Sequence, residues 1–210
     1  MTAATAPRHG VVLHAVSWST YQSLIHDLGD DPGKRLTYDQ GNLEIMVPLP
    51  PHERYKSRLS RIVEVTTEET ATEIASLGST TWSRNDLQRG LEPDACFYIQ
   101  HEQAIRSKEE IDLTVDPPPD LAIEVDNTYS SLNRLAIYAA LGVPEVWRFD
   151  GETLTLYRLE EGQYVIQETS TALPLLSQAD ILRFLQASQT MGETSWVRAF
   201  RQWVREKHQA

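Results

Sequence analysis

Residues 121–149 restrict the fold of this chain more than any other segment, because they read as a strand, a helix and a second strand in succession. Leu121–Val125 is apolar except for Glu124, and residues 131–141 place leucine, isoleucine and tyrosine at helical spacing. Gly142 is expected to end that helix, and Glu145–Phe149 returns to a strand pattern. This order predicts two strands of one sheet joined by a crossover helix.

The rest of the chain predicts hairpins and further helices around this unit. Strands are expected at 36–38, 43–46, 80–82, 95–99, 153–158 and 163–168, and helices at 17–28, 52–73, 177–187 and 193–207. Hairpins beside one crossover helix favour an α/β or α+β fold with a central mixed sheet flanked by helices. A length of 210 residues suits one domain over residues 1–210.

Composition excludes several classes of protein. The chain has 1 cysteine, which rules out an intramolecular disulfide or a thiolate zinc cage and fits a reducing compartment. No apolar run or N-terminal signal pattern predicts a membrane or an export segment, so we expect a cytoplasmic protein with no membrane partner. The net charge of −11 argues against a simple nucleic-acid coat, although a local basic groove is compatible with it.

An acidic pair is the strongest chemical signal, since the chain has no P-loop, dinucleotide fingerprint, His-Glu-x-x-His pair or nucleophile elbow. Asp94 begins one strand, and Glu124 interrupts an apolar one, where burying a carboxylate is costly without a partner. If the two strands are neighbours, both carboxylates converge on a hard cation, Mg²⁺ or Mn²⁺. The alternative is a turn residue at Asp94 and an edge charge at Glu124 that faces solvent or an arginine.

Four segments in the same order resemble the Uma-two family of restriction-endonuclease-like proteins. They are residues 43–48, 91–94, 119–125 and 138–147, and the resemblance spans about 36–164. It implies the PD-(D/E)XK nuclease fold, a central mixed sheet with helices on both sides, and metal-dependent endonuclease cleavage of DNA. The helices at about 177–207 would then extend a single nuclease-like domain.

The resemblance also assigns site residues. Asp94 and Glu124 match the two acidic metal ligands, and the carbonyl of Val125 is a further candidate ligand. The superfamily lysine is expected two residues after Glu124, where this chain has Asp126. Asp126 either helps to hold the metal or opens a turn through residue 128. The resemblance also places a cation in the next helix, where Arg134 keeps the charge but cannot act as a base.

Three residues of the predicted helix at 52–73 are further candidates. Lys56 is a second candidate for the missing cation, and Glu53 for an additional acid near the metal, as the superfamily often supplies from its first core helix. His52 is a candidate to contact a phosphate or a water. The alternatives are a solvated helix face for Lys56 and a capping or packing role for His52.

Two functions are compatible with these residues. The first is a Mg²⁺- or Mn²⁺-dependent DNA endonuclease, and the second is a catalytically inactive nuclease-fold module that binds nucleic acid or a protein partner. Arginine stripes at 54, 58 and 61 and at 198, 201 and 205 suit a phosphate backbone or, alternatively, simple solvation. Because duplex cleavage needs two cuts and symmetric dimers are the commonest oligomers, a homodimer is favoured, but no segment locates an interface.

Overall fold

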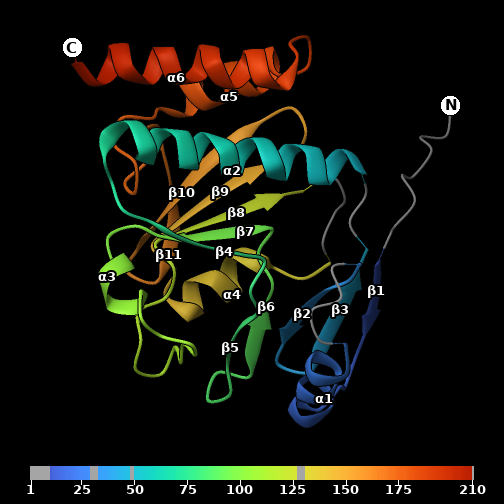
Figure 1. Ribbon diagram of the computed structural model, residues 1–210. Helices are drawn as coiled ribbons and strands as arrows, with labels where there is room; N and C mark the ends of the chain where they lie inside the picture. The colour runs from blue at the N-terminus through green and yellow to red at the C-terminus, as the bar shows by residue number, and fades with distance from the viewer. Residues whose placement is uncertain (1–9, 29–32, 48–49, 127–130, 210) are drawn as a thin grey trace, which may run out of the picture.

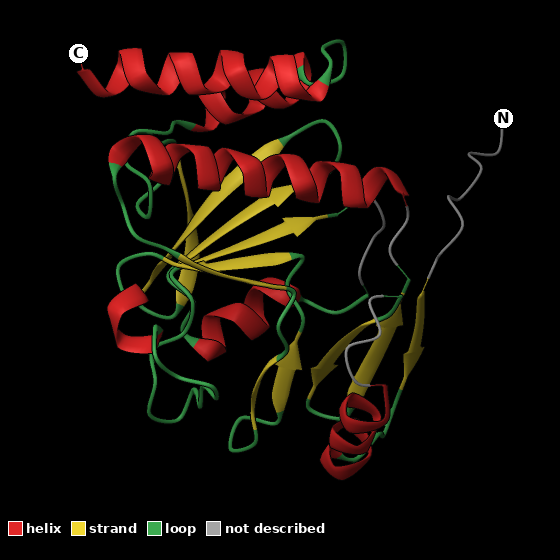
Figure 2. Cartoon of the chain, in the orientation of Figure 1, coloured by secondary structure: helices red, strands yellow, loops and turns green. Residues whose placement is uncertain are grey.

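The strands of the chain form two separate sheets, a mixed one and an antiparallel one (Figures 1 and 2). The computed structural model describes residues 10–28, 33–47, 50–126 and 131–209. The strands are β1 (Gly10–Leu13), β2 (Arg35–Asp39), β3 (Asn42–Met46), β4 (Ala75–Gly78), β5 (Trp82–Arg84), β6 (Arg89–Leu91), β7 (Ala95–Tyr98), β8 (Leu121–Val125), β9 (Glu145–Phe149), β10 (Leu154–Glu160) and β11 (Gln163–Gln167). The helices are α1 (Trp18–Leu28), α2 (Pro50–Thr70), α3 (Glu102–Ile105), α4 (Arg134–Leu141), α5 (Gln178–Ala187) and α6 (Glu193–Gln209).

The larger sheet has six strands in the order β11-β10-β9-β8-β7-β4. Strands β8 and β9 are parallel, with Leu121 opposite Glu145 and Val125 opposite Phe149, and α4 forms the connection between them. The other pairs in this sheet are antiparallel. The predicted crossover unit and the central mixed sheet are therefore confirmed.

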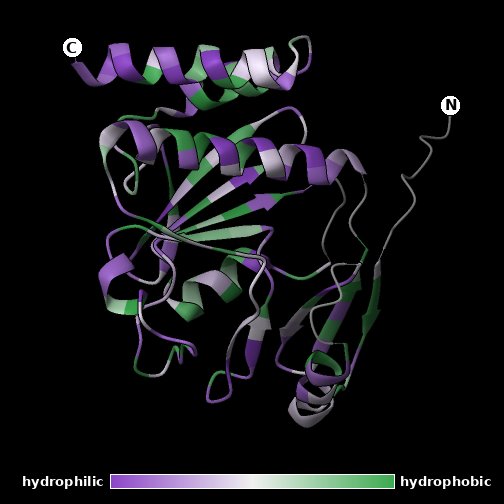
Figure 3. Cartoon of the chain, in the orientation of Figure 1, coloured by the Kyte–Doolittle hydropathy of each residue, from purple (hydrophilic) through white to green (hydrophobic). Residues whose placement is uncertain are grey.

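Helices cover both faces of the six-stranded sheet (Figure 1). The side chains of β8 alternate between the two faces. Leu121, Ile123 and Val125 join the core under α2, α5 and α6, whereas Ala122 joins the core under α4. Helix α6 is banded in purple and green in Figure 3, and its Phe200 is fully buried against the same core as β8. The alternation leaves Glu124 on the α4 face, away from the larger apolar side chains.

The smaller sheet has the order β1-β3-β2-β6-β5 and carries α1 on one side. The strand expected at 80–82 is instead β5, which begins at Trp82 and pairs with β6 in this sheet. The neighbour of β7 is instead β4, and the amide of Thr80 donates to the carbonyl of Leu77 in a turn between β4 and β5. Local composition identified a strand there but carried no information on its partner.

Several helix ends lie at residues that cap them. The hydroxyl of Ser17 accepts a hydrogen bond from the amide of Thr20 at the start of α1, and Gly142 ends α4 with a φ of 81°. Helix α4 begins at Arg134 and not at 131, because the side chain of Asn133 caps it by accepting from the amide of Ala136. None of the helices in the described ranges is both long and apolar enough to cross a lipid bilayer.

Candidate active site

The two predicted acidic residues face each other across neighbouring strands. Ala95 in β7 pairs with Ile123 in β8, which places Asp94, just before β7, opposite Glu124. The amide of Asp94 donates to the carbonyl of Ile123 at 3.1 Å, and the amide of Val125 donates to Asp94 Oδ2 at 2.6 Å. The antiparallel pairing therefore brings both carboxylates to one end of the sheet, as expected if their strands are neighbours.

Asp94 is buried and accepts a hydrogen bond from a histidine in the first turn of α2. His52 Nε2 donates to Asp94 Oδ1 at 2.7 Å, and both side chains are almost fully buried. Burial by itself lowers the pKa of His52, but the hydrogen bond to Asp94 and the charges of Asp94, Glu53 and Glu124 outweigh it, so the pKa is raised above its usual value. His52 thus fixes the orientation of the Asp94 carboxylate from the other side of the sheet end.

Glu124 is bound by two side chains of α4. Arg134 donates to it with both arms of a fork, Nε to Oε2 at 3.0 Å and Nη2 to Oε1 at 2.6 Å. The hydroxyl of Tyr138, one helical turn further on, also donates to Oε1. The guanidinium and the hydroxyl therefore offset the free-energy cost of burying the Glu124 carboxylate in an apolar strand.

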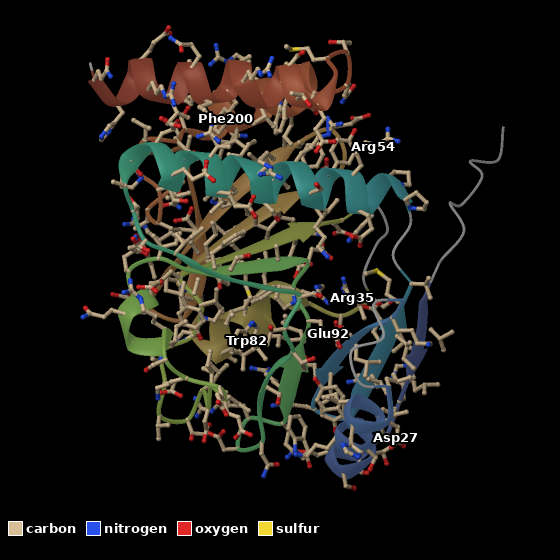
Figure 4. The ribbon with its side chains drawn as sticks, in the orientation of Figure 1. Asp27, Arg35, Arg54, Trp82, Glu92 and Phe200 are labelled. Atoms are coloured by element: carbon tan, nitrogen blue, oxygen red, sulfur yellow. The ribbon has the colours of Figure 1, made fainter. Side chains whose placement is uncertain are left out.

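The guanidinium of Arg134 also joins the two sheets. Its Nη1 donates to the hydroxyl of Thr37 in β2, and its Nη2 donates to the carbonyl of Glu92 at 2.7 Å. Glu92 lies beside Arg35 of β2 at this junction, with 3.8 Å between Arg35 Nη1 and Glu92 Oε2 (Figure 4). Of the five N–H groups of Arg134, therefore, most are already used within the protein.

Burial sets the charge state of this network. It raises the pKa of Glu124, and the nearby charge of Asp94 adds to the effect, while Arg134 and Tyr138 oppose it. The pKa of Tyr138 is raised well above its usual value by burial and by the charge of Glu124. For Arg134, burial alone would lower the pKa, but the charge of Glu124 overcomes it and the pKa is raised. Arg134 accordingly stays charged and Tyr138 stays a hydrogen-bond donor.

A pocket of about 90 Å³ opens beside Glu124, between β3, the ends of β8 and β9, and the start of α4. Its charged lining consists of Glu44, Glu124, Asp126, Arg134 and Arg148. Asp126 does not act as a free acid there, because Arg148 Nε donates to its Oδ2 at 3.2 Å and Arg148 Nη2 donates to the same oxygen. The turn expected from Asp126 to residue 128 falls largely outside the described residues.

The oxygen atoms at this end of the sheet are of the type that a hard divalent cation binds. Asp94, Glu124 and the Val125 carbonyl offer oxygen atoms, and Mg²⁺ often takes only one or two carboxylates and completes its shell with water and phosphate. Both oxygens of Asp94 and Oε2 of Glu124 each accept one hydrogen bond and keep a second lone pair, whereas Oε1 of Glu124 accepts two. Within the described ranges, no three acidic, histidine or cysteine side chains converge on a common point that would hold a metal without substrate.

The comparison with known families agrees with this geometry. The sequence profile described as "Uma2: Putative restriction endonuclease" matches residues 18–190, most of the chain. This protein belongs to the Uma2 family. None of the curated protein sequences matches it.

A solved structure confirms the fold of this Uma2 protein. The crystal structure of a "putative nuclease belonging to DUF820" from Anabaena variabilis superposes with a TM-score of 0.56 at 15% identity. The match covers 87% of this chain and 99% of that chain. At this identity the likeness concerns the arrangement of the elements.

Two predicted site residues of the Uma2 protein make no direct contact with the acidic pair. Lys56 and Glu53 form an ion pair with each other at 3.5 Å on α2, with side chains 22% and 47% exposed. Neither donates to nor accepts from Asp94 or Glu124 within the described part of the chain. Arg134, and not Lys56, is therefore the cation that the fold brings to the acidic pair.

The arginine stripes of the Uma2 protein are largely engaged within the molecule. Arg201 donates to Glu68 and Glu69, and Arg205 donates to Glu69, so α6 is bound to α2 by these ion pairs. Arg58 donates to the carbonyl of Ser188 at 2.7 Å. These contacts favour helix packing over a phosphate track for three of the six arginines.

Three members of the network were not predicted from the sequence of the Uma2 protein. Tyr138 had a detectable signal, because it lies four residues after Arg134 and hence on the same helix face. Arg148 had a weaker one as the charged residue between Trp147 and Phe149 in an apolar strand. Thr37 had none, because its contact with Arg134 depends on how the two sheets pack.

Proposed function

We propose that this protein is a metal-dependent endonuclease that hydrolyses DNA phosphodiester bonds. The observation that carries the proposal is the meeting of two buried carboxylates, Asp94 and Glu124, with the guanidinium of Arg134 at one sheet end. These are two acids and one cation from three separate segments, with an arginine where the PD-(D/E)XK pattern has a lysine. Membership of the Uma2 family supports the same reaction class.

We assign the metal to Asp94, Glu124 and the carbonyl of Val125. A Mg²⁺ or Mn²⁺ ion bound there would polarise a phosphate and lower the pKa of a bound water. The side chains around it position these ligands. His52 holds Asp94 through Oδ1, and Arg134 with Tyr138 holds Glu124.

Arg134 is a positioning residue in this proposal. Its guanidinium stays charged and cannot accept a proton, and its donors are directed to Glu124, Thr37 and the carbonyl of Glu92. It therefore holds the carboxylate in place and does not act as a base. In this proposal Lys56 and Glu53 have no direct contact with the metal ligands, since they pair with each other.

A cleavage assay with near-isosteric variants tests the proposal. Purified protein is incubated with supercoiled DNA in Mg²⁺ or Mn²⁺, next to Asp94→Asn and Glu124→Gln, with the exposed Glu152→Gln as the matched control. Nicking should require metal, fall about a hundredfold or more in both site variants and stay unchanged in the control. Metal-independent nicking, or equal nicking by all proteins with intact circular dichroism spectra, would refute it.

The bidentate pair between Arg134 and Glu124 favours one second candidate, a module that binds DNA without cutting it. A guanidinium on the carboxylate opposes a dication at the same oxygens, since like charges repel at short range. Calorimetry with Mn²⁺ separates the candidates, because the endonuclease binds the metal and loses it in Asp94→Asn, whereas the module binds none.

Light scattering of the protein with and without duplex measures whether two copies act together on the two strands.

A further inference from the structure

We propose that Arg148 is the residue that binds the DNA phosphate in this site, held in place by Asp126. The inference rests on the proposed function and names how its substrate is recognised. The expected lysine position holds Asp126, and the structure shows that this carboxylate brings in a cation from the neighbouring strand β9. The end of β8 thereby gains a guanidinium from a residue 22 positions further along the chain, paired with the carboxylate that holds it.

The sheet register places Arg148 beside the acidic pair. In the parallel pairing of β8 with β9, Arg148 stands opposite Glu124, so both side chains project from the same face. Both also line the pocket of about 90 Å³. This pocket lies at the carboxyl ends of two parallel strands joined by a crossover helix, where open α/β sheets bind their ligands.

Arg148 is also the more available of the two pocket arginines. Arg134 donates hydrogen bonds to Glu124, Thr37 and the carbonyl of Glu92, and its side chain is 15% exposed. The side chain of Arg148 is 43% exposed, and Asp126 is its one hydrogen-bond acceptor among the described residues. A planar guanidinium with N–H groups left over suits a phosphate, which accepts two parallel hydrogen bonds.

The charge balance of the pocket explains why Arg148 would act together with a metal ion. Three carboxylates (Glu44, Glu124 and Asp126) line the pocket against two guanidinium groups. An anion entering this lining alone meets a surplus of negative charge, whereas a bound dication reverses the balance. Phosphate binding through Arg148 is therefore expected to be strong only when a divalent cation is present.

Fluorescence anisotropy with a short fluorescein-labelled DNA duplex tests this inference without cleavage. The wild-type chain, Arg148→Gln and Arg148→Lys are titrated with and without Ca²⁺, an oxygen-ligated dication, at several salt concentrations. Arg158→Gln is the matched control, because Arg158 on β10 is 47% exposed and also pairs with one carboxylate, Glu160, but does not line the pocket. Nicking of supercoiled DNA in Mg²⁺ is measured on the same samples.

In Ca²⁺ the Arg148→Gln variant should bind the duplex about tenfold more weakly than wild type, and its slope of log affinity against log salt should be about 0.9 smaller. Arg148→Lys should keep the wild-type slope but lose part of the affinity, because the charge remains and the fork does not. Arg158→Gln should match wild type.

Equal affinity and slope for Arg148→Gln and Arg158→Gln would overturn the inference, even if wild type nicks DNA normally. The opposite result, loss of binding in Arg148→Gln with no nicking by wild type, would uphold the inference and remove the catalytic half of the proposed function. A wild-type chain that neither binds nor nicks the duplex in any cation would overturn both.

Discussion

Removing the guanidinium that binds Glu124 is the most informative perturbation of this chain. Arg134→Met keeps the length and apolar stem of the side chain. It leaves the buried carboxylate of Glu124 with the hydroxyl of Tyr138 as its hydrogen-bond donor and without a neighbouring guanidinium. Breaking a buried ion pair by deleting one partner costs about 3–5 kcal/mol, because the remaining charge stays unpaired. A domain of ordinary stability has about 5–15 kcal/mol in total, so the variant should lose a large part of it.

A double-mutant cycle isolates the pair from other effects. Replacing both partners, Arg134→Met with Glu124→Leu, removes the unpaired charge and should recover most of the loss. A deficit of about 1–2 kcal/mol should remain, because Thr37 and the carbonyl of Glu92 lose their donor. Arg158→Met, at an exposed pair with Glu160, is the control and should change the free energy of unfolding by about 0.5 kcal/mol or less.

The same variant should respond to pH with a definite sign. The pKa of Glu124 is already raised in the folded protein, and losing Arg134 raises it further. A group whose folded pKa lies above its unfolded pKa stabilises the fold at low pH and loses that contribution as the pH rises. The deficit of Arg134→Met relative to wild type should thus grow on going from acidic to alkaline solution.

Urea unfolding followed by tryptophan fluorescence and circular dichroism measures each free energy at two pH values. Any of three results would refute the role given to the Arg134 guanidinium: a loss below about 1 kcal/mol in Arg134→Met, a loss in the double variant equal to the sum of the two single losses, or a deficit that shrinks with rising pH.

Three further predictions concern other parts of the molecule. Gly90→Ala should destabilise the smaller sheet by about 1–3 kcal/mol in urea unfolding, because an added Cβ would come within 2.9 Å of the ring of Tyr21. Adding Tyr21→Phe should relieve part of this loss, since it deletes a buried hydroxyl that has no hydrogen-bond partner among the described residues. Asp94→Asn should lower the pKa of His52, read from its ring signals in an NMR titration, since the hydrogen bond and charge that raise it are weakened. Phe200→Ala should cost about 3–5 kcal/mol in a single cooperative transition if the C-terminal helices belong to the same domain, whereas a separate early transition would divide the chain in two.

The parts of the fold that depend on neighbouring residues could be predicted from the sequence. The alternation in Leu121–Val125, the helical spacing up to Leu141 and the stop at Gly142 are local properties, and each has its expected place in the structure. The division into two sheets was not predicted. Strand β5 has the same composition signals whether it joins β7 or β6, and its partner depends on packing between segments far apart in the chain.

The candidate site divides in the same way. The sequence pointed to Asp94 and Glu124 because a charged residue in an apolar strand requires compensation, and it allowed an arginine as the partner of Glu124. It did not indicate which cation meets which carboxylate. Arg134 was the first candidate and Lys56 the second, and the fold placed Arg134 on Glu124 and Lys56 on Glu53. The partner of Asp126 came from a strand that the parallel register brings alongside.

The bonds of Arg134 have a consequence for how such a chain can change over evolutionary time. Its guanidinium binds Glu124 and also strand β2 and the residue before Pro93, so one side chain of the proposed active site also holds the two sheets together. A lineage without nuclease activity would still be selected to retain Glu124, Arg134 and Tyr138, because their loss endangers folding. Retention of these residues in a relative is therefore evidence of an intact architecture, and turnover in that relative has to be measured directly.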